Sequence, residues 1–527
     1  MSTNVTSTNI ASTNSLFTGI VGITGTSTVG GQLNVTGNIL NSGNCIVSGT
    51  IPSSMSQVGV LRLSEYDVRS GNGANGYHSF AFIDTNNSIR YIGHSGWNST
   101  NPSSRPKPLV YNTAIILNLP DNEMPLKVYN YPRNLFAIST TNKLYGLGYN
   151  GEGQLGIIGN SGIPIKFNCL TDVSNVKCVI SNNSAIANAS MYAITHSGDA
   201  YSWGYNTYGQ LGQGSTAVIG RPQKILFETG VYGPVNQICC NGGSNDATDV
   251  ATWKISTCAL VGDAVYCVGY GLNRQMGNNT ISETNINWIK PKLSQTTPLP
   301  SIKMIGAAGS YDSSTFFALD NANNLYAWGA NKSSEATDIP KTGSAFAELI
   351  STNVDEFWPC SASLNQACLF IKTKDISNNI YCCGANSYGQ LGLGNTATTT
   401  TLTKCTSLNG YNVKSIITSG NGGAPTIFAV VDSFNGVQLL GCGYNSGGLG
   451  YVSDIVSNFT PIYFDCGPGV TISNVMTSQL IGFRSTTIIL TSNNKLYGMG
   501  YSNYNWFSCN NLPASQYYIK QITNILC

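Results

Sequence analysis

Sixteen cysteines and three histidines are the residues of this chain best suited to ligate a metal or to act as nucleophiles. Cys239 and Cys240 are adjacent, as are Cys382 and Cys383, and the spacing Cys-x-x-Cys does not occur. Zinc sites use closely spaced cysteines and histidines, so the sequence does not predict one. Because free cysteine is a common small apolar core residue, we interpret the cysteines in strand-like segments as buried, reduced thiols. These are Cys258, Cys267, Cys368 and Cys442.

The histidines and acidic residues do not form a recognisable catalytic pattern. His196 in THSGD is expected in a turn beside Asp199, while His78 and His94 lie in or near a predicted hairpin, where we expect structural hydrogen bonds. The 24 acidic residues show no motif spacing, and no nucleophile elbow, phosphate loop or metal signature is present. We therefore expect neither an enzyme nor a bound cofactor.

The elements that position these residues follow a repeat, which decides the architecture. Strand-like segments such as FFALD (316–320) lead through a polar turn into a second strand such as NLYAWG (324–329). Two apolar runs joined by Asn, Gly, Asp or Ser predict a β-hairpin. Eight hairpins align on one glycine each, at intervals of 55, 56, 65, 60, 55, 59 and 57 residues by subtraction. The glycines are Gly93, Gly148, Gly204, Gly269, Gly329, Gly384, Gly443 and Gly500.

Two further strands complete each period. An apolar segment marked by proline follows the glycine, as in RPQKILF, and then a fourth strand such as LKVYN from Leu126 or VKCVI from Val176. Four strands per period predict one blade of a β-propeller. The last such strand, IKQITNI, contains Ile519 and Ile522, and we expect it to complete the first blade and so close the ring. A weaker candidate for the missing strand of the first blade is VGVLRL from Val58.

The fullest copies read YGLGYNGEGQLG (145–156), YSWGYNTYGQLG (201–212) and YCCGANSYGQLG (381–392). They resemble the regulator-of-chromosome-condensation repeat proteins, whose repeats end in aromatic-Gly-x-Asn-x-x-Gly-Gln-Leu-Gly. The resemblance covers residues 75–527 and implies an all-β propeller, usually of seven blades, whereas eight hairpins are counted here. The sequence thus predicts an eight- or seven-bladed ring over residues 55–527. The resemblance implies a scaffold or guanine-nucleotide exchange regulator, although exchange factors of the family use a wedge and charged surface that this sequence does not show.

Charge and hydropathy limit the partners. Only 9% of the residues are charged, with 26 Lys plus Arg against 24 Asp plus Glu, so phosphate or nucleic-acid binding is not expected. No apolar run of about 18 residues occurs, so we expect no membrane insertion. The N-terminus shows no basic region followed by an apolar core, and we expect no secretory signal.

Residues 1–54 differ in composition from the rest and begin with a Ser/Thr/Asn tract. From Phe17 to Ile51 the odd positions are mostly apolar or Gly and the even positions mostly polar, which indicates a one-sided β-structure. Such a Gly-rich face needs partners, and it resembles the shaft repeats of viral and phage fibres, so we expect a homotrimer or filament through residues 17–51. The alternative is a disordered linker. The predicted oligomerisation face is Val21, Ile23, Val29, Leu33, Val35, Ile39 and Val47.

Two functional classes follow. The first is a non-enzymatic fibre component on a virion surface or outside the cell, whose propeller head binds a host-surface protein or glycan or its own neighbours. The second is a cytoplasmic propeller scaffold or exchange regulator. Binding is expected in the non-repeating insertions, 242–254 and 333–344, more than at the loop tyrosines, for which packing between blades is the favoured role. The tyrosines are Tyr149, Tyr205, Tyr208, Tyr270, Tyr388 and Tyr444.

Overall fold

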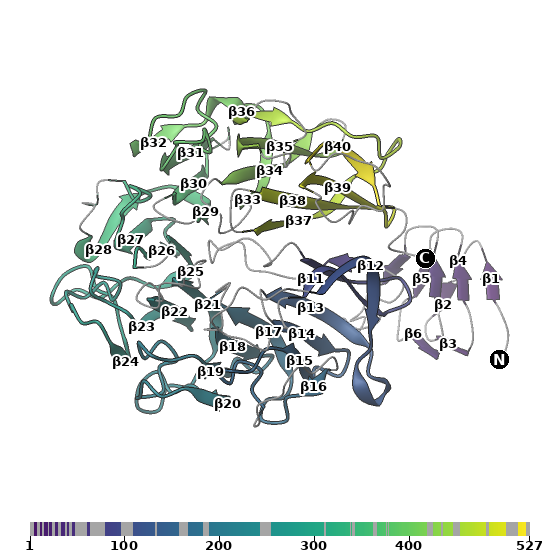
Figure 1. Cartoon of the computed structure of the whole chain (residues 1–527), viewed down its shortest axis with the longest axis horizontal. Coiled ribbons are helices and arrows are strands. Elements are labelled where there is room, and N and C mark those ends of the chain that lie inside the picture. The colour runs from purple at the N-terminus through teal and green to yellow at the C-terminus, as the bar shows by residue number, and fades with distance from the viewer. Residues whose placement is uncertain are drawn as a thin grey trace. The chain divides into compact units, whose positions relative to one another are not determined.

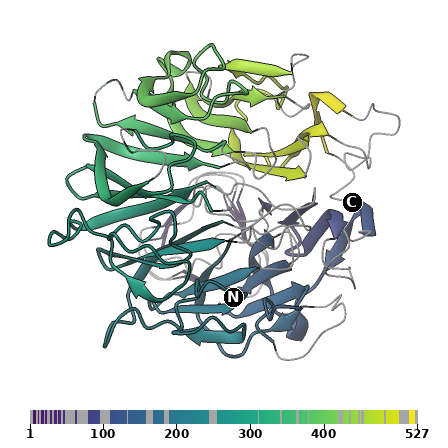
Figure 2. The same cartoon turned by 60° about the vertical axis from the view of Figure 1, so that its left-hand side comes forward.

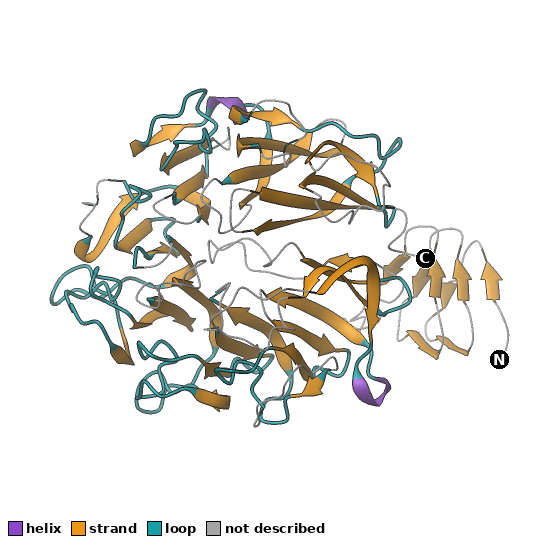
Figure 3. Ribbon diagram, in the orientation of Figure 1, coloured by secondary structure: helices purple, strands orange, loops and turns teal. Residues whose placement is uncertain are grey.

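The computed structural model divides the chain into two compact units, Met1–Gly59 and Val60–Cys527. In the first unit it describes the strands alone. In the second it describes residues 61–63, 79–95, 109–131, 134–157, 167–182, 189–242, 254–309, 312–337, 339, 343–361, 366–375, 377, 379–418, 425–433, 436–445, 449, 454–480, 484–501 and 515–522. Strands dominate both units (Figure 3), and the described helices are short 3-10 turns at η3 (Pro120–Asn122) and η5 (Thr406–Leu408).

The first unit contains eight short strands that pair in parallel. They form three sheets with the orders β1-β4-β7, β2-β5-β8 and β3-β6, and partner residues are 16 to 18 positions apart, as in Val5 opposite Val21 and Val21 opposite Ile39. A nearly constant offset means that the backbone returns to the same sheets on successive turns. The strands thus find partners within one chain, which the sequence did not predict, and self-association through residues 17–51 stays a prediction. The strands are β1 (Val5–Ser7), β2 (Ala11–Ser12), β3 (Ser15–Thr18), β4 (Val21–Ile23), β5 (Ser27–Val29), β6 (Leu33–Thr36), β7 (Ile39–Asn41) and β8 (Cys45–Val47).

The second unit is an eight-bladed β-propeller, and each blade consists of four strands consecutive in the chain. The blades follow one another round a common centre (Figures 1 and 2), with the first strands of the labelled blades toward the centre and the fourth toward the rim. The first four blades are β9–β12 (Arg62–Leu63, Ser79–Ile83, Ile89–Ser95, Leu109–Leu117), β13–β16 (Pro125–Tyr131, Asn134–Ser139, Leu144–Gly148, Asn168–Cys169), β17–β20 (Val176–Ser181, Ser190–Thr195, Ala200–Gly204, Ile219–Lys224) and β21–β24 (Val235–Gly242, Ile255–Val261, Ala264–Gly269, Asn285–Ile289). The last four are β25–β28 (Ile302–Ala308, Thr315–Asp320, Leu325–Gly329, Ser344–Ser351), β29–β32 (Val354–Cys360, Cys368–Thr373, Ile380–Gly384, Thr399–Lys404), β33–β36 (Asn412–Thr418, Thr426–Ser433, Gly436–Tyr444, Ile455–Pro461) and β37–β40 (Ile472–Leu480, Arg484–Thr491, Leu496–Tyr501, Ser515–Gln521).

The predicted hairpins form the second and third strands of the blades. Their turns contain residues with positive φ, such as Asn142 at 61°, Gly198 at 84°, Asn323 at 67° and Asn494 at 59°. Asn and Gly accept this backbone region more readily than other residues. The turn composition that predicted the hairpins therefore has a direct conformational cause.

The predicted closure of the ring is wrong. Strand β40, which contains Ile519, pairs with β39 in the last blade, with Gln521 opposite Tyr497. The first blade is completed by β9, in which Leu63 lies opposite Phe82 of β10. The strands predicted as fourth, such as β13 and β17, are in fact the first strands of the next blade. A cyclic repeat does not mark where one blade begins, so the sequence placed the boundary one strand too late.

Side-chain packing closes the ring instead. Ile522 is 1% exposed and lies in one hydrophobic cluster with Leu63 and Phe82 of the first blade and Ile488 of the last. Ile519 is half-buried on the other side of the last blade, against the cluster that blades seven and eight share. Further clusters join blades one and two, two to four, four and five, five and six, and six and seven. A hydrophobic core thus runs round the whole ring.

Candidate interaction surface

The repeat glycines allow a close approach between backbone segments within a blade. Gly204 ends β19 with φ of 98°, and a Cβ there would lie 2.4 Å from the carbonyl oxygen of Ala189. The same oxygen accepts a hydrogen bond from the Tyr205 N–H at 3.1 Å. Only glycine fits this close approach at positive φ. Seven repeat glycines have φ between 98° and 127°, namely Gly148, Gly204, Gly269, Gly329, Gly384, Gly443 and Gly500. The eighth, Gly93, lies in β11.

Polar side chains of the repeat loops fix the conformation of those loops through hydrogen bonds to backbone groups. Asn206 is fully buried, and its Oδ1 accepts the Leu211 N–H at 2.9 Å. Gln210 is also fully buried: its Oε1 accepts the Tyr208 N–H at 3.0 Å, and its Nε2 donates to the Tyr205 carbonyl at 2.9 Å. Asn386 and Gln390 make the equivalent bonds to backbone N–H groups in blade six. These motif residues therefore shape the ring.

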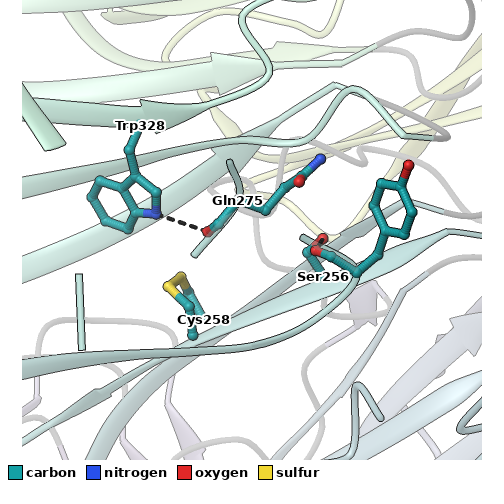
Figure 4. The surroundings of a disulfide bond; sticks show 6 residues. Ser256, Cys258, Gln275 and Trp328 are labelled. Carbon is teal, nitrogen blue, oxygen red and sulfur yellow. Dashed lines mark hydrogen bonds between the residues drawn. A yellow bond between two sulfur atoms is a disulfide. The ribbon is translucent and has the colours of Figure 1, made fainter. Parts of the chain in front are cut away.

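Neighbouring blades are joined by a hydrogen bond that was not predicted from the sequence. Where the residue before the repeat glycine is Trp or Cys, its side chain donates to the carbonyl of the Gln position in the preceding blade, as Trp203 Nε1 does to Gln154 at 2.9 Å. Trp328 makes the same bond to Gln275 at 3.1 Å (Figure 4). Cys442 Sγ takes this role toward the Gln390 carbonyl at 3.3 Å. The signal in the sequence was the recurrence of Trp or Cys before the glycine in four copies, because both side chains have a hydrogen-bond donor.

The first part of one insertion nominated as a binding region, from Ser333 to Thr337, is a buried repeat turn. Glu335 stands at the Gln position and is fully buried, with Oε1 accepting from Thr315 Oγ1 at 2.7 Å and Oε2 from the Ser333 N–H at 2.8 Å. The segment from Ser333 to Thr337 is buried throughout. The other insertion lies outside the described residues except for Gly242 and Lys254.

The loop tyrosines form contacts from blade to blade. Tyr208 of blade three meets Tyr270 of blade four edge-to-face, with ring centroids 5.6 Å apart. Tyr388 and Tyr444 repeat this contact at 5.5 Å between blades six and seven. Burial raises the pKa of Tyr208 to about 12, so this phenol stays protonated at neutral pH. Tyr205 is buried.

The candidate nucleophiles and ligands do not assemble into a reaction centre in the part of the chain that the structure describes. His196 is exposed in the turn after β18, and its backbone N–H donates to the Asn175 carbonyl at 2.9 Å. His78 and the side chain of His94 lie outside the described residues. Within the described residues, no group of three or more His, Cys, Asp or Glu side chains could hold a metal ion. Across those same stretches, no helix is long and apolar enough to cross a membrane.

The interpretation of Cys258 and Cys267 as free thiols is wrong. They lie opposite each other on β22 and β23 and form a disulfide bond with a Cα–Cα distance of 4.3 Å (Figure 4). The other strand cysteines named from the sequence, Cys368 and Cys442, are buried free thiols. Spacing along the chain could not reveal the pair, because their proximity follows from the register of the hairpin.

A surface groove, called here the groove of blade seven, is lined by residues of blade seven and of its connection to blade eight. It has a volume of about 370 Å³ and lies between β35 and β37. Tyr463 at its edge is 82% exposed, whereas its neighbour Phe464 packs on Tyr497 with ring centroids 5.0 Å apart. Such a volume falls within the range of ligand pockets. The lining residues are Val437–Leu439, Pro461–Phe464, Cys466–Val470 and Ile472.

A smaller pocket of about 190 Å³ lies at the rim of blade four and includes Asp263, Lys290 and Pro298 in its wall. Lys290 Nζ forms a 2.8 Å ion pair with Glu228, which also accepts a hydrogen bond from Tyr266. These two donors hold the pKa of Glu228 below its usual value. The cation of this pocket is therefore already paired, so we favour the groove of blade seven as the interaction surface.

Comparison with known proteins identifies two copies of the repeat. Residues 197–244 and 377–423 match the regulator of chromosome condensation (RCC1) repeat. The chain is therefore similar to RCC1-repeat proteins over these two stretches. It is 26% identical over 208 residues to the E3 ubiquitin-protein ligase HERC2 of Homo sapiens, and 23% identical over 269 residues to the ultraviolet-B receptor UVR8 of Arabidopsis thaliana. These alignments cover 39% and 49% of this chain but only 4% of HERC2 and 52% of UVR8.

Two solved structures are similar to this chain at low sequence identity. Yeast RCC1 (Prp20), solved with Kap60, is 14% identical with a TM-score of 0.48, over 85% of this chain and 96% of that one. Human WBSCR16 is 15% identical with a TM-score of 0.47, over 68% of this chain and 87% of that one.

Proposed function

We propose that this chain is a non-enzymatic protein-binding scaffold, whose RCC1-repeat ring presents the groove of blade seven to an extended segment of a partner protein. The observation that carries the proposal is Tyr463, which is 82% exposed at the edge of a groove of about 370 Å³. Tyrosine is enriched among the residues that dominate binding energies, because its ring is large, rigid and amphipathic.

The walls of the groove define the chemistry of the partner. Ile462 and Val470 provide apolar surface, and Pro461 and Pro468 restrict the backbone on either side of Tyr463. A rigid groove loses little conformational entropy on binding. We expect an uncharged, extended peptide with one apolar or aromatic residue that packs on the Tyr463 ring.

The relatives support a scaffold more than a particular reaction. HERC2 and UVR8 are named for different activities, a ubiquitin ligase and an ultraviolet-B receptor. One fold can host many functions. The comparisons therefore favour the propeller scaffold over the fibre component.

Selection from a phage-displayed peptide library on the immobilised full-length protein tests this proposal. Enriched peptides are expected to bind the wild type and to lose binding to Tyr463→Ser. Leu349→Ser is the matched control, because Leu349 is 52% exposed on β28 of another blade. Peptides that bind both variants equally would reject the groove. Accelerated nucleotide release from a panel of small GTPases, unchanged by Tyr463→Ser, would instead favour an exchange regulator.

A fibre head is the second candidate, and it rests on the composition of residues 1–54. Light scattering compares the mass of the full chain with that of a chain starting at Ser56. A trimer or larger assembly that becomes monomeric on truncation supports self-association through residues 17–51. Two monomers remove this candidate.

A further inference from the structure

Blade six contains two pairs of neighbouring buried thiols. Cys360 ends β29 and Cys368 begins β30, and the two residues lie directly opposite each other. They are 2% and 0% exposed within the cluster between blades six and seven. Cys258 and Cys267 of blade four have the same relation, opposite each other on adjacent strands and buried, and they form a disulfide. Directly opposed residues lie within the Cα separation that a disulfide needs.

The second pair consists of Cys382 and Cys405. Their sulfur atoms lie 3.4 and 3.5 Å from one shared atom, the carbonyl oxygen of Leu391. Both residues are buried, at 0% and 1% exposed. Two sulfur atoms directed at one acceptor are close neighbours, whereas Cys442 of the same cluster donates to a different carbonyl, that of Gln390.

Blade three shows what the ring itself requires at these positions. Ser202 replaces Cys382 and donates to the Leu211 carbonyl at 2.9 Å. Ile225 replaces Cys405, and its N–H donates to the Ala200 carbonyl as the Cys405 N–H does to Ile380. One donor and one apolar side chain are therefore sufficient to build a blade. The second thiol of the pair is an addition particular to blade six.

The environment makes the pair chemically unequal. The pKa of Cys405 is lowered by a hydrogen bond from the Cys382 thiol and further by Ser407, against the effect of burial. The same contact and burial raise the pKa of Cys382. The thiolate is the reactive form of cysteine. In the packed blade the Cys405 thiol is therefore the more easily deprotonated of the two.

We propose that blade six is a redox site that closes two cross-strand disulfides, Cys360–Cys368 and Cys382–Cys405. A low-molecular-weight disulfide is the oxidant. One thiolate of the pair attacks it and releases one small thiol, and the other thiol then attacks the resulting mixed disulfide and releases the second, so two electrons and two protons pass to the oxidant. Cys360 and Cys368 react in the same way. Because all four side chains are buried, exchange occurs before the blade packs.

Peptide mapping of the full-length protein tests the proposal. The protein is refolded in oxidised and reduced glutathione, alkylated and digested with trypsin. We expect Thr342–Lys372 to carry the Cys360–Cys368 bond, lighter by two hydrogen atoms, and Asp375–Lys404 to be joined to Cys405–Lys414 through Cys382. Alkylation of all four cysteines would overturn the proposal, and so would a link through Cys383. The Cys258–Cys267 bond in the same digest shows that the oxidant was effective.

A variant built from blade three separates the redox effect from packing. Cys382→Ser with Cys405→Ile gives blade six the residues that blade three uses. Reduction is expected to lower the urea midpoint of the wild type more than that of this variant. An equal decrease would show that Cys382 and Cys405 form no bond.

Discussion

Replacement of Gly204 by alanine tests whether the repeat glycines hold the blades through a backbone contact. Gly204 has φ of 98°, and a Cβ would meet the Ala189 carbonyl oxygen at 2.4 Å. The matched control is Gly214→Ala, since Gly214 also has positive φ, 70°, but the nearest atom to its Cβ would be Asn287 Oδ1 at 3.8 Å. Both variants carry backbone strain, and only Gly204→Ala must also displace the main chain.

The expected magnitudes follow from these contacts. Left-handed backbone strain costs about 1–2 kcal/mol for a residue with a side chain. Gly204→Ala adds the loss of the Tyr205 N–H bond to Ala189, about 1 kcal/mol, and overpacking of about 1–3 kcal/mol. We therefore expect a loss of about 3–6 kcal/mol for Gly204→Ala and about 1–2 kcal/mol for Gly214→Ala. Urea unfolding followed by tryptophan fluorescence measures both, and equal losses would refute the reasoning.

Three further predictions concern the seam, the blade-to-blade bond and pH. Ile522→Asp buries a carboxylate where Ile522 is 1% exposed, so we expect a loss of about 4 kcal/mol or more and a clear fall in Tm; the same Tm as Ile281→Asp, whose site is 55% exposed, would contradict closure by packing. Trp203→Phe removes a 2.9 Å bond between blades and should cost about 1–3 kcal/mol in urea unfolding, and an unchanged midpoint would show that this bond adds no stability. The pKa of Glu228 is lowered from 4.5 by hydrogen bonds from Lys290 and Tyr266, so its contribution is present above pH 4.5 and lost as the pH falls below that value. The protection of the amides of residues 225–234, relative to their intrinsic exchange rates, should therefore decrease in acid, and a decrease of the same size in Lys290→Met would reject this cause.

The repeat and its hairpins could be predicted because local chemistry determines them. Positive φ at turn residues such as Asn323 and at repeat glycines such as Gly329 selects residue types that are visible in one sequence. The eight hairpins and the all-β propeller followed from that pattern. The boundary between blades could not be predicted from that pattern, because a cyclic repeat does not show which strand begins a blade. The pairing of β40 with β39 depends on tertiary contacts.

The candidate site was harder to predict for the same reason. The exposure of Tyr463 depends on how the residues around Pro461 and Ile472 fold back on blade seven, and no repeat position marks it. The segment from Ser333 looked like an insertion because Glu335 replaces Gln and Ser334 replaces Gly. The structure shows that the substituted residues keep the turn, with Ser334 at a φ of 59°.

Affinity of a selected peptide for the groove of blade seven tests the central claim most directly. Titration of a labelled peptide into the full-length wild type, Tyr463→Ser and Leu349→Ser gives three values of Kd. Loss of a dominant interface residue costs about 2 kcal/mol or more, so Tyr463→Ser should weaken binding roughly 30-fold while Leu349→Ser leaves it unchanged. Equal affinity for all three proteins would contradict the assignment of this groove as the protein-binding site.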